Sequence, residues 1–381
     1  MIGIYIHVPF CMRKCFYCAF DSLPKTKWSE NFIEEYINCV CCEIERTSYT
    51  KKVDTIFFGG GTPSILSPKQ IEHVILKIDK KFGIVPNAEI SMECNPCTVN
   101  DNLISDFRNA GINRISIGGQ SFDDSLLKKI GRLHSSFELS KTLEKACSLN
   151  FDSVGVDLIF GFPNYTKDIL ASDIDHVLKF PVEHISFYMF MPEDGTILGD
   201  KCINGELDIL DDDLLVDMME YTHGQFVQNG FCHYEISNFA KNGKFCKHNL
   251  KYWNFEEYLG FGSSACSFVN GNRIKNISDP FQYCKNIVNR DNIQEYTEKL
   301  PLNKSEGEFV MLALRMAKGV SCSEFYKIFG EEFDKVYFKE LEFLTKNGFI
   351  EKKSQNGDVF FDIPYKFFPI QSEIAKYFII L

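Results

Sequence analysis

Hydrophobic residues in the first half of the chain gather in short runs that alternate with longer segments of mixed polarity. Six runs are rich in β-branched and aromatic residues and are bounded by polar turns, which is the pattern of β-strands. They cover residues 3–8, 53–59, 88–94, 113–119, 153–160 and 184–190. Segments 30–47, 68–82, 99–109 and 137–149 repeat their apolar residues at helical spacing. The chain up to residue 191 is therefore predicted to alternate strands with helices.

This alternation predicts a parallel sheet joined by right-handed crossovers. The strands are apolar along nearly their whole length, which indicates a sheet covered on both faces. Chemically distinctive sequences follow them: HVPFC, GGGTPS, ECNP, GGQSF, GFP and MPEDG. A β/α barrel builds its active site at the carboxyl ends of its strands, so we expect a partial (β/α)6 TIM-like barrel with its site at that end. A doubly wound open sheet is the competing architecture, because periodicity alone does not distinguish the two.

The pattern changes after residue 192, where a polar, acidic stretch leads to a predicted helix at 211–228 and then to an α+β middle region. From residue 304 we expect helices at 305–317, 322–329 and 331–347, a hairpin turning at Asn356-Gly357, and a last helix. Helices followed by a small hairpin indicate a winged-helix-like module. The sequence therefore predicts three domains, at residues 1–200, 201–303 and 304–381.

Charge and composition narrow the classes of partner. A formal net charge of −11 argues against broad electrostatic binding to nucleic acid. No stretch approaches the roughly 18 uninterrupted apolar residues of a membrane helix, so we expect no integral membrane segment. The N-terminal residues MIGIYIHVPF lack the basic region of a signal peptide. With 15 cysteines and no export signal, the chain is predicted to be cytoplasmic and to use some thiols for metal binding or catalysis.

The loop after the first predicted strand holds Cys11, Cys15 and Cys18 in the sequence CMRKCFYC. Three thiolates can each bind one iron of a four-iron cluster and leave the fourth iron without a protein ligand. An open metal position is typical of a catalytic site. Zinc is an alternative, with His7 as the fourth ligand. Unliganded thiols are a second alternative, and beside the two basic residues of this loop they would be exposed and have a low pKa.

The spacing C-x3-C-x-aromatic-C, with Tyr17 in the aromatic position, resembles the signature of the radical S-adenosylmethionine (radical SAM) family. The resemblance implies a [4Fe-4S] cluster held by Cys11, Cys15 and Cys18, whose open iron binds the methionyl group of SAM. In that family an electron from the cluster cleaves the sulfonium to give a 5′-deoxyadenosyl radical. The GGGTPS loop resembles the family's loop for the methionyl amino group, where glycine lets a ligand approach the backbone closely.

Further motifs narrow the resemblance. The motifs that carry it are YIHVPFC, FGGGTPS, ECNP, GGQSF, GRLH and DLIFGFP. Over nearly the whole chain, the sequence resembles the oxygen-independent coproporphyrinogen III oxidase-like subfamily. The resemblance implies cofactor contacts from Tyr5, Tyr17, Gly60, Gly61, Thr62, Glu93, Gln120, Arg132 and Asp157. Glu93 and Asp157 would accept hydrogen bonds from ammonium or ribose hydroxyl groups. Arg132 would pair with a carboxylate, and Tyr17 would pack on adenine. Without the resemblance, the two acidic residues could be helix caps and Arg132 a solvated charge.

The subfamily has two branches, an oxidase and a heme chaperone of the HemW type. In the oxidase branch the motif continues as C-x3-C-x2-C-x-C, whereas Phe20 occupies the fourth position here, which is the chaperone pattern. The oxidase also carries a longer segment before its first strand. The sequence HNLKYW matches the chaperone motif H-N-x-x-Y-W, whose histidine is the proposed axial heme ligand and is His248 here. From local sequence alone, His248 would be a core histidine beside core aromatic residues.

The glycine-rich stretch YLGFGSSACSF departs from the family pattern G-x-G-A-H-S, because Ser264 replaces a glycine and Cys266 replaces the histidine. The role of that histidine is therefore lost here or taken by cysteine. The resemblance implies a chaperone that binds heme or porphyrin and delivers it to an acceptor protein, with a reductant such as flavodoxin or ferredoxin; it also allows a homodimer. Oxidative decarboxylation of coproporphyrinogen III is the alternative function.

Overall fold

The structure is a computed structural model that describes residues 1–379 of the 381-residue chain. The chain divides into two units. The first contains Met1–Leu215 and Glu257–Glu298, and the second contains Val216–Glu256 and Lys299–Leu381. Each unit is thus built from two separate stretches, and the division into three sequential domains stays a prediction. Within residues 1–379, every helix is too short or too polar to cross a bilayer.

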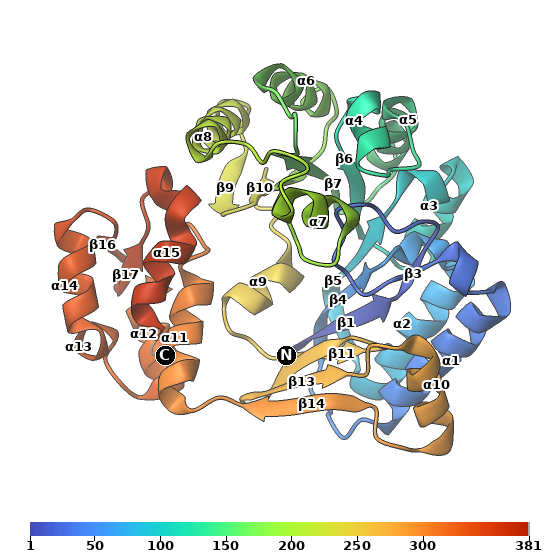
Figure 1. The fold of residues 1–381 in the computed structure, drawn as a ribbon. Helices are drawn as coiled ribbons and strands as arrows, with labels where there is room; N and C mark the ends of the chain where they lie inside the picture. The colour runs from blue at the N-terminus through green and yellow to red at the C-terminus, as the bar shows by residue number, and fades with distance from the viewer. Residues whose placement is uncertain (380–381) are drawn as a thin grey trace. The chain divides into compact units, whose positions relative to one another are not determined.

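A large sheet forms the centre of the first unit, and six of its strands are those predicted from the sequence (Figure 1). They are β1 (Ile2–Val8), β4 (Val53–Gly60), β5 (Ile84–Cys94), β6 (Arg114–Gln120), β7 (Ser153–Phe160) and β8 (His184–Met189). Each strand is parallel to the next and hydrogen-bonded to it in this order. A doubly wound sheet reverses its strand order at a switch point. These six strands do not, so they fit the predicted partial barrel.

Helices follow these strands and begin at caps that the sequence encodes. They are α1 (Glu30–Arg46), α2 (Pro68–Phe82), α3 (Asp101–Asn109), α4 (Asp124–Lys129), α5 (Ser136–Cys147), α6 (Lys167–Val177) and α7 (Ile197–Ile203). Ser67 and Ser135 open α2 and α5 with capping boxes. Helix α2 buries Ile71, Val74 and Ile78, three residues at helical spacing. In Figure 1, helices α1, α2, α3, α5 and α6 line the outer side of the strands, whereas α7 lies in front of the strands.

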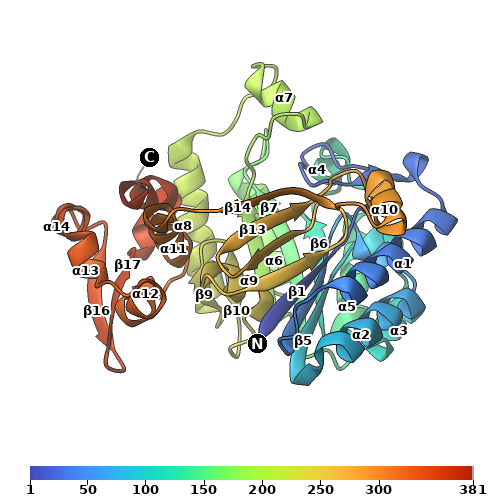
Figure 2. The ribbon, with the colours of Figure 1, turned by 90° about the horizontal axis from the view of Figure 1, so that it is seen from below.

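Strands from a later part of the chain extend the sheet beyond β1. They are β11 (Tyr258–Phe261), β12 (Cys266–Val269), β13 (Asn272–Asn276) and β14 (Gln294–Lys299), and they continue outward in that order. Strand β11 is parallel to β1, whereas β12 and β13 form an antiparallel hairpin. Helix α10 (Pro280–Asn289) packs against α1 (Figure 2). The sequence analysis did not predict these strands or this helix.

Short elements complete the first unit around the cysteine loop. They are β2 (Phe10–Cys11), β3 (Leu23–Pro24), η1 (Lys25–Lys27), η2 (Pro63–Ile65) and η3 (Pro96–Thr98). Strands β2 and β3 pair in parallel and close the base of the loop. This pairing fixes the position of Cys11, the first cysteine of the loop.

The second unit combines a middle segment with the C-terminal part of the chain. The middle segment holds most of α8 (Asp212–Gln228), then β9 (Cys232–Glu235), β10 (Asn238–Ala240) and α9 (Lys247–Trp253). The C-terminal part holds α11 (Leu302–Ala313), β15 (Val320–Ser321), α12 (Cys322–Phe329), α13 (Phe333–Val336), α14 (Phe338–Lys346), β16 (Glu351–Gln355), β17 (Asp358–Asp362), η4 (Tyr365–Ile370), α15 (Gln371–Ala375) and η5 (Lys376–Phe378). Its sheet order is β15-β17-β16. Asn356 and Gly357 have φ angles of 52° and 83°, as the predicted hairpin turn requires.

The two segments of the second unit share one core. Aromatic residues such as Phe309, Phe325 and Phe333 form its centre, and Phe255 from the middle segment packs against them. The backbone N–H of Ala317 also donates to the Tyr234 carbonyl at 3.0 Å. The middle segment and the C-terminal part therefore stabilise each other.

Candidate functional site

The cysteine loop is held in place by contacts with a segment more than 100 residues away in the sequence. The backbone N–H of Phe16 donates to the Ile130 carbonyl at 3.0 Å. The guanidinium of Arg13 donates to the Gly131 carbonyl at 2.7 Å. Because Arg13 is engaged there, it does not serve as a free cation beside the thiols. The loop between Cys11 and Cys18 is thus fixed against the segment that follows α4.

Of the three thiols, Cys11 is buried, and Cys15 and Cys18 are partly buried. The Cys11 Sγ accepts a hydrogen bond from the Thr62 hydroxyl at 3.4 Å, and the Cys15 Sγ lies 3.6 Å from the Arg132 Nη1. Burial raises the pKa of Cys11, and it raises the pKa of Cys18 to about 11. The expectation that unliganded thiols here would be exposed and acidic is therefore wrong for Cys11 and Cys18, because their surroundings desolvate the thiolate.

The geometry does not favour the zinc alternative. Within residues 1–379, no group of three or more His, Cys, Asp or Glu side chains has the spacing that one metal ion needs. His7 already bonds through both ring nitrogens, with Nδ1 3.2 Å from the Tyr5 hydroxyl and Nε2 3.0 Å from the Asp21 carbonyl. Thiolates that bind different irons of a cluster lie farther apart than the ligands of one ion. The cysteines therefore suit a cluster better than a single zinc.

A cavity of about 520 Å³ opens at the carboxyl ends of the strands and gathers most of the predicted site. Its walls include eleven predicted residues: Cys11, Cys15, Tyr17, Cys18, Gly60, Gly61, Thr62, Glu93, Gln120, Arg132 and Asp157. Most of them come from the carboxyl halves of β4, β5, β6 and β7 or from the loops after β1 and β4, and Arg132 follows α4, so parallel winding brings them together. Tyr5 does not line this cavity; its ring stacks on Phe57 behind the wall.

The glycine loop after β4 leaves no room for side chains. Gly60 has a φ of 108°, and a Cβ placed on it would lie 2.7 Å from the His7 ring. A Cβ on Gly61 would lie 2.7 Å from the Phe10 carbonyl oxygen and 2.9 Å from that of Val8. Only glycine adopts the positive φ of Gly60 easily and also avoids these close contacts. Because it has no side chain, a ligand can approach the backbone.

Two carboxyl groups stand close together in the cavity wall. Burial, and after it the charge of Asp157, raises the pKa of Glu93 to about 8, while a hydrogen bond from the Gly60 backbone opposes the shift. Burial also raises the pKa of Asp157, whose Oδ1 accepts from the Ser116 hydroxyl at 2.9 Å. Two desolvated carboxyl groups repel each other, so this wall suits a cationic ligand.

Arg132 joins the strand ends to the cysteine loop. Its guanidinium donates to the Gly118 carbonyl at the end of β6 and also approaches Cys15. Gln120, two residues beyond Gly118, is buried with a φ of 68°, a conformation that a non-glycine residue rarely adopts. Backbone strain of this kind is concentrated at functional sites.

Several residues of the cavity were missed by the sequence analysis. Tyr188 and Met191 line it from the end of β8 and are 40% and 62% exposed, which is unusual for large apolar residues. Phe20 also lines the cavity and is 66% exposed. The position of MPEDG after the sixth predicted strand signalled the loop, but hydrophobic residues there are indistinguishable from a continuing strand. The outer part of the cavity is therefore more apolar than the motifs indicated.

The predicted heme ligand, His248, belongs to α9 in the second unit. It is completely buried, and its Nε2 lies 2.8 Å from the Tyr252 hydroxyl. Burial lowers its pKa to about 3, so the imidazole is neutral at physiological pH. The guanidinium of Arg315 lies 4.4 Å from the centre of the neighbouring Trp253 ring. An iron could reach this nitrogen of His248 only after the Tyr252 hydroxyl moves.

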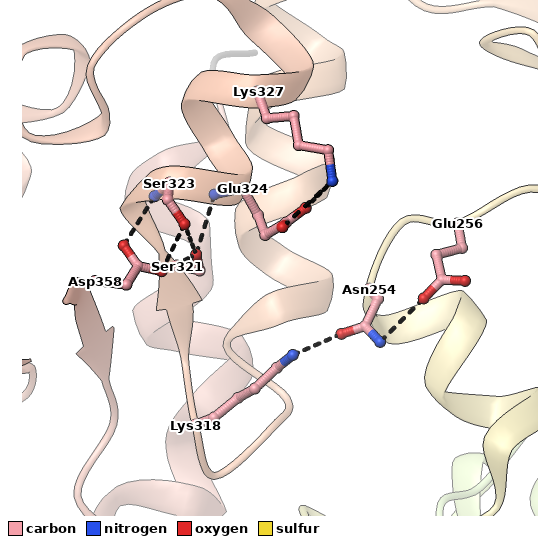
Figure 3. Close-up of polar contacts among 8 residues, drawn as sticks. All are labelled: Asn254, Glu256, Lys318, Ser321, Ser323, Glu324, Lys327 and Asp358. Atoms are coloured by element: carbon pink, nitrogen blue, oxygen red, sulfur yellow. Dashed lines mark hydrogen bonds and ion pairs between the residues drawn. The ribbon is translucent and has the colours of Figure 1, made fainter. Parts of the chain in front are cut away.

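The end of α9 is tied to the C-terminal part of the same unit (Figure 3). The Lys318 Nζ donates to the Asn254 Oδ1 at 2.9 Å, and Asn254 in turn contacts Glu256. In Figure 3, Ser321 and Ser323 both bond to Asp358 and so fix the start of α12 to strand β17. The helix that carries His248 is therefore anchored by a polar network at its carboxyl end.

The structure shows the surroundings of Ser264 and Cys266, the two residues that depart from the family pattern. Ser264 has a φ of 57° and donates from its hydroxyl to the Asp21 Oδ2 at 2.7 Å. Cys266 begins β12 and is exposed. Both residues lie in the first unit, whereas His248 lies in the second.

The comparisons with known families agree with this geometry. The sequence model of the Radical SAM superfamily matches residues 5–177, which contain the cysteine loop and five strands of the partial barrel. The model of the HemN C-terminal domain matches residues 307–356 in the second unit.

Full-length relatives decide the family. The heme chaperone HemW of Lactococcus lactis is 34% identical over 342 residues, which cover 88% of this chain and 87% of the relative. The heme chaperone HemW of Bacillus subtilis is 33% identical, with 92% of this chain and 93% of the relative covered. The chain belongs to the HemW family.

A solved structure shares the fold of this HemW family member. It is coproporphyrinogen III oxidase (HemN) of Escherichia coli, described as a radical SAM enzyme. Its TM-score is 0.83 at 20% identity, with 99% of this chain and 89% of that chain covered. At this identity the match confirms the predicted radical SAM fold and carries no conclusion about activity.

Membership of the radical SAM superfamily implies a [4Fe-4S] cluster and SAM. The residues of this HemW family member fit both groups. Three thiols share one cavity with a glycine loop that has no room for side chains. The same cavity holds a carboxyl pair suited to a cation and a guanidinium suited to a carboxylate. These are the complementary groups that a cluster-bound amino acid sulfonium requires.

Proposed function

We propose that this chain is a heme chaperone that carries a [4Fe-4S] cluster and SAM and transfers heme to an acceptor protein. The observation that carries the proposal is the single cavity in which the three signature cysteines meet the predicted SAM residues. Phe20, in place of the oxidase cysteine, lines that cavity and favours the chaperone branch. The relatives that match most of the chain are named heme chaperones.

Cys11, Cys15 and Cys18 would hold the cluster. The loop is fixed by Arg13 and Phe16, so its thiols are already positioned for binding. When bound, the cluster supplies an open iron for SAM and a source of one electron. Arg132 beside Cys15 would stabilise the negative charge of the thiolate ligand.

The remaining cavity residues would bind SAM. Gly60 and Gly61 would present backbone groups to its amino acid part, because a side chain there would block the approach. Glu93 and Asp157 would accept hydrogen bonds from its ammonium or ribose groups, and ligand binding would relieve their repulsion. Arg132, Thr62 and Gln120 would hold its carboxylate and orient the wall. Tyr17, whose ring packs on Phe162, would contact adenine.

Two of the predicted cofactor residues would act differently from the rest. Tyr5 lies behind the cavity wall, so its proposed role is to orient His7 through their hydrogen bond. His248 would be the axial heme ligand, and its neutral imidazole is the form that binds iron. Tyr252 would have to release the His248 Nε2 before that bond forms. A rotation of the Tyr252 side chain would therefore accompany heme binding.

The partners belong to the same proposal. A flavodoxin- or ferredoxin-type reductant is supported by the exposed Lys14 beside the cavity, since a cation suits an acidic donor protein. The acceptor protein and a homodimer rest on the family resemblance alone.

The alternative function is oxidative decarboxylation of coproporphyrinogen III. The motifs that the two branches of the subfamily share allow it. The exposed Phe20 at the fourth position of the motif argues against it. Supplying coproporphyrinogen III, SAM and a reductant tests it directly, and protoporphyrinogen formed with enzymatic turnover would replace the chaperone proposal.

Titration of the reconstituted protein with heme under anaerobic conditions tests the chaperone proposal. We expect a saturable Soret band in the wild-type protein that is lost in His248→Ala. The matched control is His73→Ala, because His73 is an exposed histidine on α2. A Soret band that is absent in the wild type, or that survives unchanged in His248→Ala, would falsify the proposal in this form.

A further inference from the structure

A second cavity of about 520 Å³ lies in the first unit, between α1, α10 and strands β11 to β14. None of the proposed cofactor residues lines it. Figure 2 shows α10 beside α1, with β13 and β14 next to them. Much of its wall is apolar and is formed by Leu259, Phe261, Ile274, Ile287 and Ile293. Its volume falls in the roughly 300–1,000 Å³ range of small-ligand sites.

Two arginines from different helices line the same cavity. The Arg46 Nη1 donates to the Ile287 carbonyl at 2.6 Å, which fixes this guanidinium at the cavity and leaves further N–H groups for a ligand. Within residues 1–379, the Arg290 guanidinium has no hydrogen-bond or ion-pair partner. An apolar wall that ends in two guanidinium groups suits an apolar ligand with carboxylates.

The acidic residues of the cavity do not cancel this preference. Glu43 accepts from the Tyr283 hydroxyl at 2.5 Å, the Asn276 side chain at 2.8 Å and the Gly262 backbone at 2.9 Å. Its carboxyl group is thus saturated with donors. Asp291 follows Arg290 in the sequence, and both side chains are exposed, so water screens the attraction between them.

Arg290 also holds an unfavourable backbone conformation. It caps the carboxyl end of α10 with a φ of 63°, in the left-handed region where glycine is the usual residue. A long side chain in this position costs conformational energy that glycine would avoid. Strain kept at a residue whose charge lines a cavity points to a function for that charge.

We propose that this cavity is a second porphyrin site, in which the macrocycle lies against the apolar wall and its propionates pair with Arg46 and Arg290. The identity of the ligand rests on the proposed function, whereas its chemistry, an apolar body with carboxylates, rests on the lining residues. A fatty acid shares that chemistry with a single carboxylate. The site would hold porphyrin independently of His248, which belongs to the other unit.

Fluorescence titration of the full-length protein with iron-free protoporphyrin IX tests the proposal, because this probe has no iron for His248 to bind. We expect saturable binding by the wild type. Ile274→Trp, which fills the cavity, should weaken it at least about 10-fold, and Arg290→Gly about 3- to 10-fold. Arg290→Gly should also leave the Tm equal or higher, because glycine relieves the backbone strain. A purely structural arginine would not give weaker binding together with an undiminished Tm.

The controls separate this proposal from the chaperone function. Val288→Trp, at a 68% exposed position of the same helix, and His248→Ala should both keep wild-type protoporphyrin binding. The proposal is overturned by absent binding, by binding that ignores both cavity variants, or by a cavity that takes dodecanoate and rejects protoporphyrin. If His248→Ala abolishes the Soret band while the cavity variants leave protoporphyrin binding unchanged, only the second site fails.

Discussion

A serine holds a glycine-like backbone conformation in the loop between β11 and β12. Ser264 has a φ of 57°, and its hydroxyl donates to Asp21. The hydrogen bond contributes about 0.5–1 kcal/mol at such a partly exposed position, which is similar to the cost of the conformation. We expect Ser264→Ala to lower the free energy of unfolding by about 0.5–1 kcal/mol and Ser264→Gly to leave it nearly unchanged. Equal losses in urea denaturation would contradict this explanation.

Glu43 makes stability depend on pH. Burial raises its pKa to about 7, whereas an unfolded glutamate titrates near 4.5. The folded state therefore binds more protons between these values, and stability falls as the pH rises from about 4.5 through 7. In the wild type this change in pH lowers the free energy of unfolding by an amount on the order of 2–3 kcal/mol. We expect Glu43→Gln to remove this pH-dependent loss.

Thermal unfolding measured from pH 5 to 8 checks the Glu43 prediction. Glu35→Gln is the matched control, because Glu35 lies on the exposed face of the same helix. Its profile should follow that of the wild type. A wild-type profile that is flat between pH 5 and 7 would show that Glu43 does not keep its proton.

Cys15 tests the proposed cluster ligands. We expect Cys15→Ala to abolish the broad iron–sulfur absorbance after anaerobic reconstitution, because two thiolates cannot hold three irons of the cluster. Cys147→Ala is the control, since Cys147 is a partly buried thiol on α5 outside the cavity. A four-iron signal that persists in Cys15→Ala would mean that the ligands are wrongly assigned.

At the scale of elements, helix α9 contains a hydrogen bond that blocks the predicted heme ligand and that the sequence did not reveal. The Tyr252 hydroxyl occupies the His248 Nε2. Tyr252→Phe keeps the ring and removes this competitor, so heme affinity should rise by roughly 5-fold, the equivalent of one hydrogen bond. The Soret titration described above measures it. Weaker heme binding in Tyr252→Phe would instead make the hydroxyl part of the heme site.

Strong periodicity explains which elements could be predicted. Strand β7 and helix α12 have their predicted bounds. The predicted helix at 331–347 breaks at Tyr337, yet Phe333, Tyr337 and Leu341 are all buried at a spacing of four. The apolar pattern therefore continues through a break that only the φ and ψ of Tyr337 reveal. Strands β11 to β13 were missed because they have four or five residues each.

The candidate site was predictable where its residues follow strongly periodic strands. Parallel winding then necessarily gathers Cys15, Glu93 and Asp157 at one end. Tyr5 stays a predicted cofactor contact, because a residue within a strand can face either side of it and Tyr5 is not among the residues that line the cavity. The hydrogen bond of His248 could not be foreseen, because local sequence does not indicate which neighbour a buried imidazole meets.

At the scale of the whole molecule, the second unit depends on two stretches of chain that lie apart in the sequence. Arg315 pairs with the buried Glu235 at 3.5 Å, and the Tyr365 hydroxyl donates to the Met219 carbonyl at 2.8 Å. A chain ending at residue 303 keeps both stretches of the first unit and loses most of the second. We expect it to retain iron–sulfur absorbance and to lose His248-dependent heme binding. Heme binding at full strength by this truncated chain would show that α9 needs no C-terminal partner.

The separation of the second unit into two stretches of chain also affects how the protein folds during its synthesis at the ribosome. Residues Val216–Glu256 emerge before their partners in Lys299–Leu381 have been synthesised. At ~5–20 residues per second, the middle segment waits on the order of ten seconds with Phe226, Tyr234 and Phe239 lacking their final enclosure. During that interval it is a candidate client of the folding machinery of the cell. A protein proposed to escort heme would thus itself need an escort while it is being made.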